Sequence, residues 1–305
     1  MKKKWLHANE EDGAIIVLVA LMMVVLLSIS ALVVDAGGLY LEKSRVQKAV
    51  DAAVLAGAQE LPSTSSAQQI AIDVANKNGV VIDANDISVT PSSIEVITET
   101  EKELTFARIM GFFTANVAAR AKAGKGGTVG GTGFLPLTVV ESAFKKGDLV
   151  SLALTTNDAS KGNFQYVRFP NTTLAENITN GYKGYLSIGM KLDTEPGNNT
   201  SSSHVRNAIN ARINADIGKL YCDSYLTADK TCSRLIYIPM VDTMAVQGSS
   251  QQITIVGFAA FLLNDSPVGT GNNAGIKGYF MDSVFPGTIG TPTVDFGLST
   301  LKLVN

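Results

Sequence analysis

The feature that most constrains this chain is an uncharged run near its N-terminus, residues 14–34. At about 1.5 Å per residue, a helix of this length spans about 31 Å, which matches the ~30 Å hydrocarbon core of a bilayer. Asp35 is the first charge after the run, and the chain has no proline before Pro62. We therefore expect one long helix over 13–62, transmembrane at 14–34 and a stalk beyond.

The charges on either side of the run predict an orientation. Lys2, Lys3 and Lys4 precede it, and basic residues close to a membrane end mark the cytoplasmic side. The far flank also carries basic residues (Lys43, Arg45 and Lys48), so the asymmetry is moderate. We expect a single-pass protein in the cell membrane, with a cytoplasmic N-terminus at 1–12 and everything beyond about residue 35 outside the cytoplasm.

A cleaved secretory signal is the alternative, because Ser28-Ile29-Ser30 resembles a small-x-small cleavage site. The apolar run is longer than the 7–15 residues usual for the apolar part of such a signal. The helical pattern also continues past this point. Both arguments favour a retained anchor, and the bulk of the chain lies outside the cytoplasm in either case.

The stalk and the residues after it predict a small α+β unit at 63–123. Leu39, Val46, Val50, Ala53 and Gly57 follow helical spacing, and many residues around them are small, so this half can lie closely against a neighbouring surface. A second helix is expected at 67–78, and strands at 86–90, 94–100 and 114–123, with a helical turn or two at 105–111.

This N-terminal region resembles the TadG-like proteins of the Flp (Tad) type IV pilus assembly system. A Gly-Ala start at residue 13 leads into the apolar run, followed by VDAGGLY at 34–40 and VDAAVLAGA at 50–58. Phe112 and Phe113, between two expected strands, are similar to an FF pair of that family, although here they follow Gly111. The resemblance covers roughly the first 123 residues, and implies the lipid bilayer and other Tad pilus assembly proteins or pilin helices as partners.

One departure from pilins concerns processing of the N-terminus. Type IV pilins and TadE-like pseudopilins, with which this N-terminal region can be compared, are cut after a glycine, with a glutamate five residues into the mature helix. If Gly13 were that glycine, the fifth residue would be Leu18. The missing glutamate favours a protein that keeps its anchor.

Beyond a glycine-rich stretch at 124–133, the sequence predicts a second, β-rich domain at 134–305. The glycines indicate a flexible linker. Val205, Ile209, Ile213 and Ile217 recur every four residues and predict one helix. Strands are expected at 149–155, 164–169, 184–192, 234–241, 252–263, 275–280 and 292–304. The fold class is therefore α+β, with a long helix packed on a small antiparallel sheet and then a mostly antiparallel β domain with one helix. Residues 192–198 and 253–263 also resemble a C-terminal region of TadG-related proteins, to which we attach no activity.

The two cysteines of the chain, Cys222 and Cys232, predict a disulfide. In an oxidising exterior, this spacing suits a bond that closes a short loop and stabilises by about 2–4 kcal/mol. The alternative is two independent buried thiols. A metal site is not expected, since no further Cys or His lies nearby to complete four ligands.

Little in the sequence indicates catalysis. His204, beside three serines at 201–203, is the only histidine after the apolar run and fits a capping or solvated side chain. Asp193 and Glu195 are read as a solvated turn pair rather than a Ca²⁺ site, and residues 86–90 (DISVT) as a plain strand rather than the metal-ion motif of a von Willebrand A domain. The net charge of −2 gives no basic field for nucleic acid.

The resulting hypothesis is a membrane-anchored accessory or structural component of Flp/Tad pilus assembly, with no enzymatic activity, cofactor or metal. The alternative is an adhesin-like binding module, in which the β domain presents a site for an external ligand.

Overall fold

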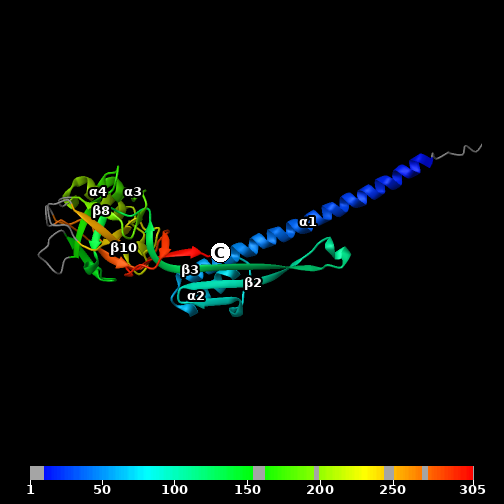
Figure 1. The fold of residues 1–305 in the computed structure, drawn as a ribbon, viewed down its shortest axis with the longest axis horizontal. Helices are drawn as coiled ribbons and strands as arrows, with labels where there is room; N and C mark the ends of the chain where they lie inside the picture. The colour runs from blue at the N-terminus through cyan, green and yellow to red at the C-terminus, as the bar shows by residue number, and fades with distance from the viewer. Residues whose placement is uncertain (1–9, 154–161, 196–198, 244–250, 270–273, 305) are drawn as a thin grey trace, which may run out of the picture. The chain divides into compact units, whose positions relative to one another are not determined.

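The structure is a computed structural model that describes residues 10–153, 162–195, 199–243, 251–269 and 274–304 (Figure 1). It divides into two compact units, residues 1–123 with 303–305 and residues 124–302. Three sets of predicted residues lie outside the described ones: 1–9 of the expected cytoplasmic N-terminus, 154–155 of the expected strand 149–155, and 196–198 of the stretch 192–198.

Helix α1 (Glu10–Gln59) is continuous, as the proline-free sequence predicts. Its side chains from Ile15 to Val34 are largely exposed on every face. The hydroxyls of Ser28 and Ser30 donate to the carbonyls of Val24 and Leu26, so the helix itself satisfies the polar groups within the apolar run. By its length and composition, α1 is the one helix in the described part of the chain that is able to cross a membrane.

The second half of α1 forms the core of the first unit. Its small and β-branched face is buried (Val46, Ala49, Val50, Ala53, Val54 and Ala58) against helix α2 (Thr64–Lys77) and strand β2 (Ser93–Glu103). Helix α2 presents Ala67, Ala71 and Ala75, all fully buried, to this interface. Two alanine-lined faces allow a close approach of the helix backbones, as the stalk sequence predicts.

A small sheet completes the first unit. Strand β1 (Ile87–Thr90), entered from the short helix η1 (Ala84–Asp86), pairs antiparallel with β2, with Ile87 opposite Val96. The first part of β3 (Thr114–Gly131) lies on the other side of β2. Between β2 and β3 the chain forms the short helix η2 (Ala107–Met110). The elements expected between 64 and 123 are therefore present, with boundaries shifted by a few residues.

The expected flexible linker is wrong in its conformation, because residues 124–131 continue strand β3. They pair antiparallel with β7 (Leu186–Ser187) and β13 (Thr288–Gly290). The glycines serve close packing: a Cβ at Gly131 would lie 2.6 Å from the Phe285 ring. A glycine run is flexible only where nothing covers it, and here aromatic side chains do.

The second unit is built on a barrel. Strand β4 (Leu137–Val140) pairs with β6 (Gly162–Arg168) and β9 (Leu235–Val241), and β9 pairs with β10 (Gln252–Leu263). Strand β8 (Lys191–Thr194) joins β10 back to β6, which closes a five-stranded ring. Further along β10 and β6, two other strands take the place of β8 between them. Strand β11 (Gly275–Met281) pairs with β10, and β5 (Leu149–Ala153) pairs with both β11 and β6. Aromatic and aliphatic side chains, including Phe164, Tyr166, Phe261 and Phe280, fill the core.

The expectation of a mostly antiparallel domain with one helix needs correction, because the sheets are mixed. Strands β4 and β9, β5 and β6, and the short β12 (Ser283–Val284) and β14 (Leu298–Leu303) pair in parallel. Alternation in a sequence marks a strand but does not identify its neighbour. The expected strand 184–192 is strand only in β7 and at Lys191 and Leu192, and 292–304 only at β14.

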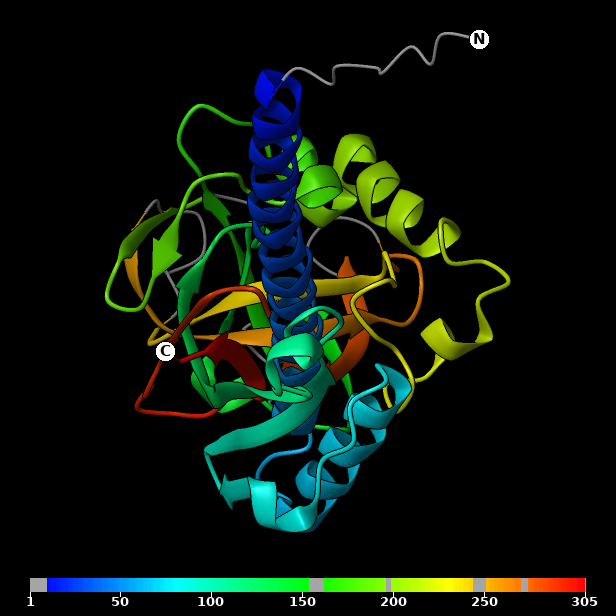
Figure 2. The same cartoon turned by 90° about the vertical axis from the view of Figure 1, so that its right-hand side faces the viewer.

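Two α-helices, not one, belong to the second unit, where α3 (Leu174–Asn180) and α4 (Ser203–Asn214) lie side by side (Figure 2). Helix α4 buries Val205, Ile209 and Ile213, but the fourth residue of that pattern, Ile217, lies beyond the helix end and is exposed. Helix α3 was missed because seven residues are too few to show periodicity. Its N-terminus does have a sequence signal, because Thr173 and Glu176 have the spacing of a capping box. In the structure the Thr173 hydroxyl accepts from the Glu176 N–H.

The close packing of α1 generates a prediction for Gly57. A Cβ at this position would lie 2.7 Å from both the Ala67 carbonyl oxygen and Ile94 Cδ1. Gly57→Ala is expected to destabilise the first unit by about 1–3 kcal/mol, measured by hydrogen exchange of the α2 amides in detergent. Gly38→Ala is the matched control: this helical glycine has open space among the described atoms, and alanine there is expected to stabilise by up to about 1 kcal/mol. Equal exchange in the two variants would contradict the packing argument.

Candidate functional site

The end of the apolar run is marked by a specific contact of Asp35. Its carboxylate accepts hydrogen bonds from three successive backbone N–H groups, those of Thr105 (2.8 Å), Phe106 (3.0 Å) and Ala107 (2.7 Å). These groups open the η2 turn, where backbone donors have no partner within the turn. One side chain on α1 therefore fixes the β2–β3 connection.

The pKa of Asp35 reflects two opposing effects. Partial removal from water raises the pKa of the carboxyl group, but the three backbone hydrogen bonds together outweigh this and hold the pKa below its ordinary value of 3.8. The carboxylate is therefore charged at neutral pH, as its three donors require.

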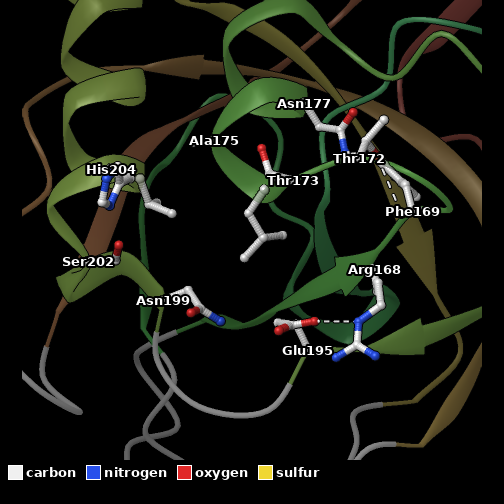
Figure 3. A pocket seen from close by; sticks show the side chains of 12 residues that line it. Arg168, Phe169, Thr172, Thr173, Ala175, Asn177, Glu195, Asn199, Ser202 and His204 are labelled. Atoms are coloured by element: carbon white, nitrogen blue, oxygen red, sulfur yellow. Dashed lines mark hydrogen bonds and ion pairs between the residues drawn. The ribbon is translucent and has the colours of Figure 1, made fainter.

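A cavity of about 490 Å³ opens on the second unit between β6, α3 and α4 (Figure 3). Arg168 and Glu195 form an ion pair along one wall, with Arg168 Nε 2.9 Å from Glu195 Oε2. Asn199 projects its amide into the space near this pair. Among the described side chains, Asn199 Nδ2 is one of the few buried polar atoms without a hydrogen-bond partner. The cavity thus offers a charged wall and an unsatisfied donor.

Of the residues weighed for catalysis or cation binding, His204 and Glu195 line this cavity, whereas Asp193 and the 86–90 stretch do not. His204 is at the second position of α4 and lines the cavity beside Ser202. Glu195 is engaged by Arg168, which leaves it poorly placed for Ca²⁺, and Asp193 is an exposed residue of β8 paired with Gln252. Ser88 and Thr90 belong to the regular strand β1, which pairs antiparallel with β2.

In the structure a disulfide joins Cys222 and Cys232, whose Cα atoms are 5.6 Å apart. Both residues are buried beside the fully buried Asp216, whose carboxylate accepts from Lys219 Nζ and from the Arg234 backbone N–H, each at 2.8 Å. Burial raises the pKa of Asp216, but Lys219 and the backbone donors of Arg234 and Ser233 outweigh this and lower it overall.

Asp216, Cys222 and Cys232 are also the one group of described residues whose spacing resembles a metal site, with ligand atoms within 4.8 Å of one another. The disulfide uses both sulfurs, and Lys219 and Arg234 occupy the carboxylate. The cluster therefore holds residues 216–234 together through a disulfide and hydrogen bonds, and its ligand atoms already have partners.

Comparison with known proteins concerns helix α1, which carries Asp35. Residues 13–60 match a family model described as "Putative Flp pilus-assembly TadE/G-like". The N-terminal helix is TadE/G-like. The matched segment coincides with α1 and includes Asp35 and the buried alanine face. No curated protein and no solved structure matches the chain.

The Asp35 contact of the TadE/G-like segment was not predicted from the sequence. Asp35 was recognised as the first charge after the apolar run and as part of the VDAGGLY stretch. The residues around it do not predict which groups 70 residues away it binds. The signal available was its isolation: a single carboxylate at the end of an apolar helix needs donors. The Asn199 cavity, in contrast, had no sequence signal.

The Asp35 contact predicts a pH dependence. Since the folded pKa is depressed, the contribution of the carboxylate is complete above its ordinary pKa and is lost as the pH falls through the lowered value. Below about pH 4, the amides of 105–107 are expected to lose protection, measured as their exchange rate relative to that of an unprotected amide at the same pH. At neutral pH, Asp35→Ala is expected to accelerate the same amides, and Glu101→Ala, an exposed carboxylate on β2, is expected to leave them unchanged. Unchanged exchange in Asp35→Ala would show that the loop is held by other contacts.

The disulfide predicts a loss of stability on its removal. Cys222→Ala/Cys232→Ala is expected to lower the free energy of unfolding of the second unit by about 2–4 kcal/mol, because the open loop gains conformational entropy. Hydrogen exchange of the β9 amides measures this, with Lys230→Ala, an exposed residue of the same loop, as control. Wild-type stability in the double variant would contradict a stabilising role, and alkylation of both thiols without reduction would show that the bond does not form in the cell.

Proposed function

We propose that the chain is a single-pass, membrane-anchored accessory protein of a Flp pilus assembly system and acts without enzymatic chemistry. The observation that carries this is that the TadE/G-like match, residues 13–60, coincides with helix α1, whose two halves have different surroundings. One half is apolar and exposed all round, and the other is buried by the chain's own α2 and β2.

The proposed orientation places the N-terminus in the cytoplasm and both units outside it. Lys2, Lys3 and Lys4 support it through the positive-inside tendency. The Cys222–Cys232 pair is compatible with it, since its geometry suits a disulfide and such bonds persist in oxidising compartments. Leu18, where a processed pilin would have glutamate, supports a retained anchor.

The proposed role is mechanical and associative. The apolar half of α1 lies among lipids and the apolar helices of other assembly components. The alanine face of the buried half cannot simultaneously serve a partner, because α2 already covers it. Partner contacts in the bilayer therefore belong to the apolar half, and the units outside are free for other contacts.

A pair of substitutions in the apolar run tests this proposal. Val25→Lys places a charge near the middle of the run and costs about 2.5–3.5 kcal/mol of insertion free energy, whereas Val25→Leu is neutral. In bacteria lacking the native protein, we expect Val25→Leu to remain in the carbonate-washed membrane and restore pili, and Val25→Lys to be reduced in both. A wild-type protein recovered from the medium without residues 13–34 would overturn the anchor. Normal pili in the absence of the protein would overturn the assembly role.

The cavity favours a second candidate, a binding module for an external ligand. Its support is the unsatisfied Asn199 amide beside the Arg168–Glu195 pair, since buried polar atoms in native structures are usually paired. Point variants test it better than removal of residues 134–305, which would strip β7, β13 and β14 from strand β3.

Asn199→Ala and His204→Ala are expected to leave pilus assembly intact and to reduce attachment of the bacteria to surfaces if the cavity is the binding site. Lys230→Ala, which is not among the residues that line this cavity, is the control. Attachment equal to wild type in both cavity variants would reject the binding role for this site.

A further inference from the structure

The connection between β2 and β3 carries an apolar cluster that the first unit does not cover. Four of its side chains are strongly exposed: Ile109 (87%), Met110 (79%), Phe112 (62%) and Phe113 (63%). Phe106, which is 41% exposed, adds a fifth apolar side chain. Contiguous exposed apolar side chains of this size mark a contact surface rather than ordinary solvent-facing residues. We call residues 105–113 the apolar loop.

Three contacts fix where the apolar loop lies along α1. The Arg120 carbonyl of β3 accepts from Gln47 Nε2 at 2.7 Å, and the Ala118 carbonyl accepts from Lys43 Nζ. The loop itself is held by Asp35. As β3 is followed back toward the loop, its partners on α1 step from 47 to 43 to 35, about 18 Å toward the apolar run. Figure 1 shows this hairpin extending beside α1 toward its N-terminal half.

The tip of the loop is therefore level with the first residue after the apolar run. Val34 ends the run and Asp35 binds the loop. If residues 14–34 cross a bilayer, this level is the boundary between hydrocarbon and headgroups. Aromatic side chains are favoured at that boundary, and apolar faces bury themselves about 5–10 Å into it.

Most backbone N–H groups of the apolar loop already have hydrogen-bond acceptors within the protein. Besides the three N–H groups bound by Asp35, those of Leu104, Ile109, Gly111 and Phe112 donate to carbonyls within the loop. A backbone with most of its donors satisfied enters a poorly hydrated layer at lower cost than one with free donors. Arg108, paired with Glu103 at 2.8 Å and still half exposed, sits among the apolar side chains where it can reach lipid phosphates.

We propose that the apolar loop inserts its Ile109, Met110, Phe112 and Phe113 side chains into the interfacial layer of the membrane that α1 crosses. This rests on the proposed membrane anchoring. Lipid is the occupant because the adjoining side chains of α1 are apolar and exposed on every face, so the loop continues the same surface. With Asp35 as the tie, the anchor and the loop form two membrane contacts on one rigid unit and limit how far the stalk can tilt.

The test uses single tryptophans in the full-length protein. The chain has one tryptophan, Trp5, so Trp5→Phe gives a background in which Phe112→Trp, Leu26→Trp and Val81→Trp are compared. Val81 is the matched exposed control: it lies two residues after Gly79, whose carbonyl accepts from Arg45, ten residues or about 15 Å further from the apolar run. Each variant is reconstituted in phosphatidylcholine–phosphatidylglycerol vesicles with bromine near the ester end or the methyl end of the acyl chains.

We expect Phe112→Trp to show a blue shift and a loss of emission that is larger with bromine near the ester end. Leu26→Trp should be quenched most by bromine near the methyl end, and Val81→Trp by neither. Adding Asp35→Ala to Phe112→Trp should reduce its quenching, because the loop loses its tie. Hydrogen exchange of the α2 amides confirms that each variant is folded.

The outcomes separate this inference from the proposed anchor. Quenched Leu26→Trp with Phe112→Trp resembling Val81→Trp overturns loop insertion and leaves the anchor standing. A blue-shifted but unquenched Phe112→Trp also overturns it, in favour of a protein partner or a second copy of the chain. Unquenched Leu26→Trp overturns the anchor and the insertion together.

Discussion

The first unit depends on how closely α1 can approach its neighbours. Alanine and glycine on both α1 and α2 let the two backbones come together, and a single methyl group at Gly57 would collide with Ala67 and Ile94. This contact converts one half of a long apolar helix into a core element and leaves the other half uncovered. Hydrogen bonds from Lys43 and Gln47 to β3 and the Asp35 cap then extend the same attachment to the end of the apolar run. The position of the apolar loop follows from these contacts.

The second unit uses a different principle. Its barrel closes by strands that fill the same gap at two heights, β8 at one and β11 with β5 at the other, around an aromatic core. The segment without strands at 216–234 is held by the buried Asp216 and the Cys222–Cys232 disulfide. Ligand sites are commonly pre-formed cavities lined by rigid strands and helices. The residues of such a site, and not the fold, determine what it binds.

Much of the first unit could be predicted from the sequence, because its signals are local. The proline-free apolar run, the small-residue face of the stalk and the alternating strands at 87–103 each depend on residues close together in the chain. The second unit was predicted less well. Its strands were recognised where they alternate, but the parallel pairs, the short α3 and the ordered glycines of β3 depend on neighbours distant in sequence. For example, the Phe285 ring lies so close to Gly131 that a side chain at that position would collide with it.

The sequence by itself determined that α1 is one helix with an apolar half able to cross a membrane, that its far half packs closely, and that it is TadE/G-like. Length, charge and residue size are properties that the chain carries without its fold. Only the tertiary structure decided which groups Asp35 binds, where the exposed side chains at 109–113 lie, and that Asn199 projects into a cavity beside Arg168 and Glu195. Those arrangements join residues far apart in the sequence, and such contacts exist only after the strands and helices have packed.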